Sequence, residues 1–152
     1  MSQKLKLNSI EEEAKACRNA FEGVQIGALV IHCHHEILSE ILTQPAEDRI
    51  FCILSVKLEH EKALRLRLFR PVNQKHLPRE LQKAYLDWQV ANAVRHKAAA
   101  DILVTYAVWE KACAVYDKAT AVWVKAAAVW LNKIHARICK NCPWDGSTIF
   151  PE

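Results

Sequence analysis

The stretch from Ala107 to Ile134 consists of four copies of one seven-residue unit in direct succession: AVWEKAC, AVYDKAT, AVWVKAA and AVWLNKI. A strict seven-residue apolar period is typical of helices that wind around one another in a left-handed supercoil. When Trp109 is placed at heptad position a, large aromatic residues recur at a and alanines recur at d. The repeat therefore predicts a coiled-coil helix whose apolar seam packs against another helix.

A lack of helix-breaking residues extends this helix toward the N-terminus. Neither Gly nor Pro occurs from Arg79 to Cys142, and good helix formers such as Ala, Lys and Leu dominate the stretch. We predict one continuous helix over residues 79–138, about 90 Å long at 1.5 Å per residue. Arg95 interrupts the apolar series, and an antiparallel fold-back with a break near residues 92–96 is the alternative.

The other heptad positions of this helix are also largely apolar. Valines recur at position g and alanines at position f, which leaves only a narrow polar stripe. A helix that is apolar over most of its circumference is usually buried on more than one side. We therefore predict a homo-oligomer, a helical assembly formed through the seam of the repeat. Its expected interface consists of Trp88, Ile102, Trp109, Ala112, Tyr116, Ala119, Trp123, Ala126 and Trp130.

Residues 1–78 mix helical and strand patterns, which predicts a small α+β head in a mainly α protein. Ser9 and Glu12 have the spacing of a capping box and indicate the start of a helix. Apolar and basic residues alternate in residues 63–70, which predicts a half-buried strand. The expected elements are helices over residues 9–21, 35–42 and 46–58 and two short strands over residues 24–31 and 63–70.

The amino-acid composition limits the classes of protein to which the chain can belong. The 152 residues include 21 Lys and Arg against 17 Asp and Glu, a mildly basic balance that falls short of the dense cationic charge of nucleic-acid binders. The N-terminal segment lacks the apolar region of a signal peptide, and no apolar run approaches the roughly 20 residues of a transmembrane helix. We expect a cytoplasmic protein with no transmembrane segment, whose six cysteines are free thiols, packing residues or metal ligands.

The C-terminal end of the predicted helix carries a candidate zinc site. His135 and Cys139 stand four residues apart on one helical face, and the Cys-x-x-Cys turn brings Cys142 to the same point. A structural zinc site needs a fourth ligand. The histidines of the His-Cys-His-His run are the candidates for this fourth ligand. If the run is a strand, His32 and His34 share a face, whereas if it is a helix, His32 and His35 share a face. Residues 139–152 are then a tail that folds back on the head.

These patterns favour a structural or interaction protein that self-associates through its heptad helix, with structural zinc as the one cofactor to test. Packing thiols and hydrogen-bonded histidines are the alternative for the cysteine and histidine residues. A nucleic-acid-binding or regulatory module is the second functional candidate, based on an exposed strand face that carries Arg65, Arg67 and Arg70. A metal-dependent enzyme that uses His34, His35 and Glu36 is the third, although the chain has no His-Glu-x-x-His motif, phosphate loop or nucleophile turn.

Overall fold

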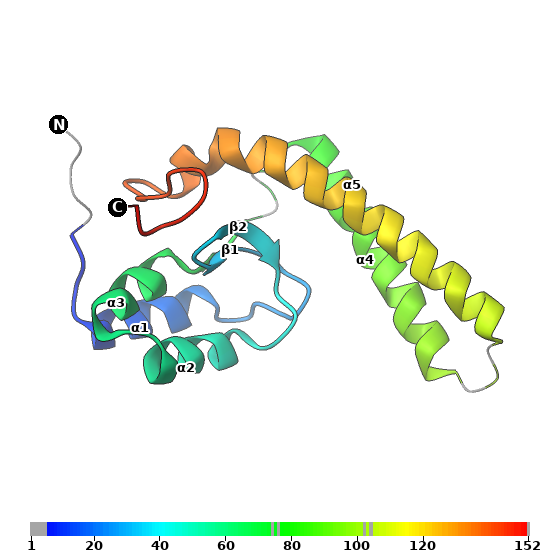
Figure 1. The fold of residues 1–152 in the computed structure, drawn as a ribbon, viewed down its shortest axis with the longest axis horizontal. Coiled ribbons are helices and arrows are strands. Elements are labelled where there is room, and N and C mark those ends of the chain that lie inside the picture. The colour runs from blue at the N-terminus through cyan, green and yellow to red at the C-terminus, as the bar shows by residue number, and fades with distance from the viewer. Residues whose placement is uncertain (1–5, 74, 76, 102, 104, 152) are drawn as a thin grey trace. The chain divides into compact units, whose positions relative to one another are not determined.

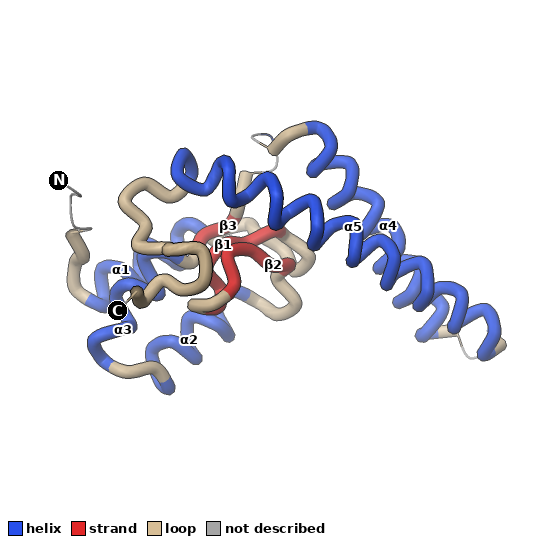
Figure 2. The backbone as a smooth tube through the Cα atoms, turned by 45° about the horizontal axis from the view of Figure 1, so that its top comes forward, coloured by secondary structure: helices blue, strands red, loops and turns tan. Residues whose placement is uncertain are grey.

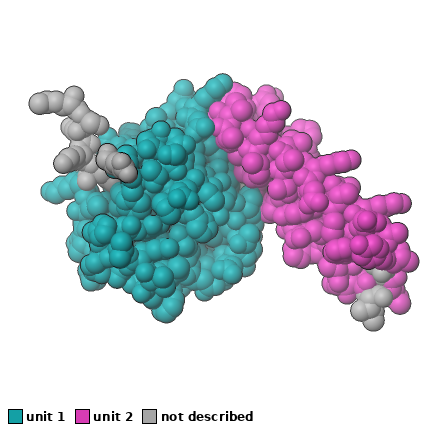
Figure 3. All heavy atoms as spheres, viewed as in Figure 1, with its two compact units in different colours: residues 1–73, 131–152 teal, residues 74–130 magenta. Residues whose placement is uncertain are grey.

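The structure, a computed structural model, describes residues 6–73, 75, 77–101, 103 and 105–151. It is mainly helical, and the described residues form five helices and one three-stranded antiparallel sheet (Figure 1). The chain divides into two compact units (Figure 3). Unit 1 comprises residues 1–73 and 131–152, and unit 2 comprises residues 74–130.

Helix α1 (Ile10–Ala20) begins at the predicted capping box. The Ser9 hydroxyl accepts a hydrogen bond from the Glu12 amide at 3.2 Å, and the Glu12 carboxylate accepts one from the Ser9 amide at 3.0 Å. Each bond satisfies an amide group that has no partner within the helix. The predicted start of this helix is confirmed.

Replacing Ser9 with Ala is expected to lower the free energy of unfolding of the protein by about 1 kcal/mol, because one amide of the first turn loses its acceptor. Urea unfolding followed by circular dichroism measures this loss, and Ser9→Thr, which keeps a hydroxyl, is the matched control. Equal unfolding midpoints for the wild type and Ser9→Ala would contradict the role of this cap.

The sheet of unit 1 has strand order β2-β1-β3, formed by β1 (Leu29–His34), β2 (Ile37–Ile41) and the two-residue β3 (Arg70–Pro71) (Figure 2). Strands β1 and β2 form a hairpin in which His34 lies opposite Ile37. Their regular pairing is broken by a register shift between Ile31 and His34. This irregularity lies in the part of β1 that contains His32.

The core of unit 1 lies between the sheet and three helices, α1, α2 (Ala46–Val56) and α3 (Glu59–Leu68). Val30 and Cys33 of β1 belong to the same buried cluster as Ile53 of α2 and Leu66 of α3. The rings of Phe21 and Phe69 add to it with centroids 4.4 Å apart. The helix predicted over residues 46–58 is confirmed as α2.

The helix predicted over residues 35–42 is wrong, because most of this segment forms strand β2. Its apolar spacing fits a helix, but the backbone groups pair with β1, and Leu42 continues the pairing by donating to the Ala28 carbonyl at 2.8 Å. The strand predicted over residues 24–31 starts late, at Leu29. Gly27, with a φ of 92°, turns the chain just before it.

The strand predicted over residues 63–70 is also wrong, because this segment is largely helix α3. Within α3, Arg65 pairs with Glu61 at 2.8 Å and Lys62 pairs with Glu59 at 2.7 Å. Side chains three or four residues apart are neighbours only on a helix, where such pairs are stabilising. The local alternation of apolar and basic residues was therefore outweighed by these pairs and by packing of Leu66 into the core.

The predicted long helix is divided into two helices. The continuous helix predicted over residues 79–138 is wrong: the chain forms α4 (Arg79–Ala100) and α5 (Tyr106–Ile138), and the break follows Ala100 rather than lying at residues 92–96. The Asp101 carboxylate accepts a hydrogen bond from the Leu103 amide at 2.9 Å, a local turn that competes with helix.

The two helices lie side by side and run in opposite directions in unit 2 (Figures 1 and 2). The ring of Tyr85 lies 5.4 Å from that of Trp123, and the ring of Trp88 lies 6.1 Å from that of Tyr116. Arg95, the exception in the heptad series, places its guanidinium 4.2 Å from the centre of the Tyr116 ring. Positions a and d of the repeat therefore pack against α4 of the same chain.

The residues of the predicted interface differ in their burial within the chain. Trp88, Ala112 and Trp123 are buried, whereas Tyr116, Ala119, Ala126 and Trp130 are partly buried and Trp109 is exposed. Ile102 lies outside the described residues. An intramolecular partner reached through a short loop costs little closure entropy, and α4 covers part of the seam in this way. Whether the seam also joins copies of the chain stays a prediction.

Candidate metal centre

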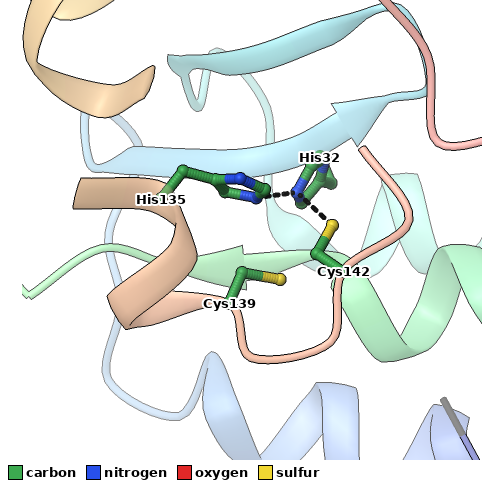
Figure 4. A group of neighbouring side chains, drawn as sticks. All are labelled: His32, His135, Cys139 and Cys142. Atoms are coloured by element: carbon green, nitrogen blue, oxygen red, sulfur yellow. Dashed lines mark hydrogen bonds between the residues drawn. The ribbon is translucent and has the colours of Figure 1, made fainter. Parts of the chain in front are cut away.

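Four side chains of unit 1 converge at the end of α5 (Figure 4). His32 comes from strand β1, His135 from the last turn of α5, and Cys139 and Cys142 from the turn that follows the helix. One potential ligand atom from each residue lies within 4.8 Å of the other three. The group could therefore hold a single metal ion.

The end of α5 positions three of the four side chains. The Cys139 amide donates to the His135 carbonyl at 2.8 Å, so these residues remain one helical turn apart and face the same side. Asn141 then adopts a φ of 59°, in the left-handed region that Asn tolerates better than most residues. Its conformation reverses the chain, and the Cys142 amide donates to the Cys139 carbonyl at 3.3 Å.

Strand β1 presents the fourth side chain through a distorted backbone. His32 has a φ of 53°, a left-handed conformation that is costly for a residue with a side chain, on the order of 1–3 kcal/mol. It lies within the register shift between Ile31 and His34. Irregularities of this kind redirect a side chain from the regular alternation of a strand. Here the redirected ring points toward the end of α5, and it is 2% exposed (Figure 4).

The distances suit ligands that share one ion. The Nε2 atoms of His32 and His135 are 2.9 Å apart, and the Cys142 sulfur lies 3.3 Å from His32 Nε2. With metal–nitrogen bonds near 2.0 Å and metal–sulfur bonds near 2.3 Å, neighbouring ligand atoms of a tetrahedral zinc site lie about 3.3–3.8 Å apart. A small outward movement of the two imidazoles would produce that spacing.

The electrostatics of the two cysteines favour one thiolate in the group. A hydrogen bond from the Cys139 thiol, with further ones from His135 and His32, holds the pKa of Cys142 well below its usual range. The same bond to Cys142, together with burial, raises the pKa of Cys139. A thiolate is the form of cysteine that binds metals. A lowered pKa favours the thiolate of Cys142, the form that a bound cation would stabilise.

Two buried polar atoms beside the group have no hydrogen-bond partner among the described residues: His32 Nδ1 and Trp144 Nε1. The ring of Trp144 lies 5.7 Å from the ring of His32 and shields one side of it. His32 is thus held by packing, and the nitrogen that takes part in polar contacts is Nε2, which faces His135 and Cys142.

His34 and His35, the other predicted donors, lie outside this group. His34 Nδ1 lies 2.6 Å from the Glu40 carboxylate, and with Cys33 these residues form a second group of potential ligands. This second group offers three potential ligands rather than four, and burial raises the pKa of the Cys33 thiol to about 12. His35 Nε2 lies 3.2 Å from Glu36.

The three arginines of the nucleic-acid alternative do not share an exposed strand face. Arg65 is 5% exposed and stacks over the Phe150 ring, in addition to its pair with Glu61. Arg70 donates to the carbonyls of Leu66 and Phe69 at 2.6 Å. Arg67 is the most exposed of the three and lies 3.8 Å from Glu13, which is buried. Intramolecular contacts therefore engage all three.

Two features of the site were missed from the sequence. Asn141 was not recognised as a left-handed residue, although Asn shortly after a helix end is a known signal for this conformation. Glu40 was not identified as a neighbour of His34, because residues 35–42 were interpreted as a helix. Assignment of that segment as a strand would have placed Glu40 on the same hairpin as His34, but the register sets Glu40 opposite Val30, so the contact itself would not have followed.

No helix within the described part of the chain is long and apolar enough to span a membrane. Comparisons with protein-family models, with curated proteins and with solved structures found no match.

Proposed function

We propose that the protein binds one zinc ion through His32, His135, Cys139 and Cys142, and that this ion has a structural role. The observation that carries the proposal is the convergence of two imidazole nitrogens and two sulfurs within 4.8 Å of one another. Two nitrogen and two sulfur ligands favour zinc over the hard cations magnesium and calcium, which prefer oxygen.

The number of protein ligands argues for a structural ion rather than a catalytic one. Catalytic zinc sites keep one coordination position open for water or substrate, whereas structural sites use four protein ligands. Both imidazoles here are buried, and Trp144 covers one side of His32. A zinc ion with these four ligands would have no position left for a substrate.

Zinc at this place would fasten strand β1 to a segment that is distant in sequence, the end of α5 and the C-terminal tail that follows it directly. Two other contacts link the described part of the tail to the head. The Ile149 amide donates to the His35 carbonyl at 3.1 Å, and Phe150 packs against Arg65. The ion would also offset the conformational cost of the left-handed backbone at His32.

Native mass spectrometry of protein purified without chelator or an affinity nickel column tests the proposal. We expect one zinc per chain in the wild type and none in His32→Ala, because three ligands in a site built for four bind the ion much more weakly. His35→Ala is the matched control, since its side chain lies outside the group and should keep the zinc. A metal-free wild type, or equal zinc in the two variants, would refute the site.

The wider role that we propose is that of a structural or interaction protein. A closed zinc site and a helical hairpin are features of a module that presents a surface. Zinc bound by thiolates also requires reduced cysteines, which fits a reducing compartment such as the cytoplasm.

A further inference from the structure

The α4–α5 hairpin of unit 2 leaves one apolar face uncovered. On α4, Leu86, Val90 and Val94 are spaced four residues apart and are more than half exposed. On α5, the exposed valines are spaced seven residues apart, at positions 108, 115, 122 and 129. We call these seven side chains the valine face. It is distinct from the aromatic seam, which packs inside the hairpin.

A groove of about 450 Å³ runs along part of this face between the two helices. Val90 and Val94 line it from α4, and Val108 and Val115 line it from α5. Its charged lining residues are Asp87 and Lys111. Contiguous apolar surface of this kind, bordered by charges, is typical of a surface that binds another protein.

We propose that the valine face binds the same face of a second copy of this chain, so that two hairpins form an antiparallel four-helix bundle. The seven-residue spacing of the α5 valines is the first reason. Side chains that repeat every seven residues form a continuous stripe along a helix. Only another helix that crosses at a small angle can contact the whole length of that stripe. The hairpin itself supplies helices with that period.

The size of the face is the second reason. Helix α4 has 22 residues. A face about 33 Å long and two helix diameters wide, about 20 Å, presents roughly 700 Å². Specific protein interfaces bury about 800 Å² per partner. The hairpin therefore has nearly the area that a stable dimer needs, without a contribution from unit 1.

Analytical ultracentrifugation of the full chain, in the metal state in which it is purified, tests the dimer. The variant Val115→Lys changes the groove, and Val124→Lys is the matched control, since Val124 is equally exposed on α5 but outside the groove lining. We expect Val115→Lys to raise the dimer dissociation constant about a hundredfold, because each dimer would bury two lysines in an apolar interface. Val124→Lys should leave the constant unchanged. A helical signal equal to that of the wild type in circular dichroism verifies that each variant is folded.

A wild type that remains monomeric at about 100 µM would overturn the proposal, because that concentration reveals even weak dimers. Equal weakening by Val115→Lys and Val124→Lys would also overturn it. Zinc content is measured separately in each sample, so loss of the dimer with zinc retained is distinguishable from failure of the metal site.

Discussion

Replacing Cys139 with Ser is expected to lower the free energy of unfolding of unit 1 by about 4 kcal/mol when zinc is present at a thousand times its dissociation constant. A ligand that binds only the folded state stabilises that state by about 4 kcal/mol when its concentration is a thousand times its dissociation constant. His32 and Cys139 are separated by more than one hundred residues in the sequence, so an unfolded chain cannot offer the same four ligands together. The variant would lose most of this stabilisation because serine replaces a thiolate.

Urea unfolding with added zinc and with a chelator measures the effect. The wild type should show a large shift of its unfolding midpoint between the two conditions, and Cys139→Ser should show almost none. Cys113→Ser is the matched control, because Cys113 is a partly buried free thiol of α5 that belongs to neither group of potential ligands. If zinc leaves the wild-type midpoint unchanged, or if the two cysteine variants behave alike, the ion has no structural role.

Truncating Trp123 to Ala should cost about 3–5 kcal/mol of unfolding free energy, the usual range for removal of a large aromatic side chain from a core. Trp123 is 4% exposed, and its ring lies 5.4 Å from that of Tyr85 on α4. Trp109 occupies the same heptad position two repeats earlier but is 38% exposed. Trp109→Ala should therefore cost less than about 1 kcal/mol.

Thermal unfolding followed by circular dichroism compares the two tryptophan variants. In the hairpin, their effects differ because α4 covers Trp123 and leaves Trp109 near the loop. A continuous helix in a symmetric assembly, the arrangement predicted from the heptads, would bury both rings in the same seam. Equal losses from the two variants would therefore favour that assembly over the hairpin.

Local signals in the sequence were sufficient to predict those features whose contacts are made by residues close together along the chain. The capping box at Ser9 and Glu12 involves residues three apart, and it defines the start of α1. His135 and Cys139 share a face because they are four residues apart in a helix. The geometry of a helix is the same in any protein, so these relations could be predicted without tertiary structure.

Strand and helix assignments failed where a short segment fitted both periods. Residues 35–42 have helical apolar spacing, yet β1 provides hydrogen-bond partners for β2. Residues 63–70 alternate like a strand, yet core packing and the Glu61–Arg65 pair hold them in α3. A segment of eight residues has too weak a preference of its own to outweigh the partners that the rest of the chain offers.

The sequence by itself determined a mainly helical chain, the seven-residue repeat and three of the four converging side chains, because all of these depend on contacts within a few helical turns. The tertiary structure decided the remaining features: the break after Ala100, the packing of the repeat on α4, and the selection of His32 rather than His34 or His35. Each of these depends on segments that are far apart in sequence. Their contacts arise from packing and chain reversal, which no local pattern encodes.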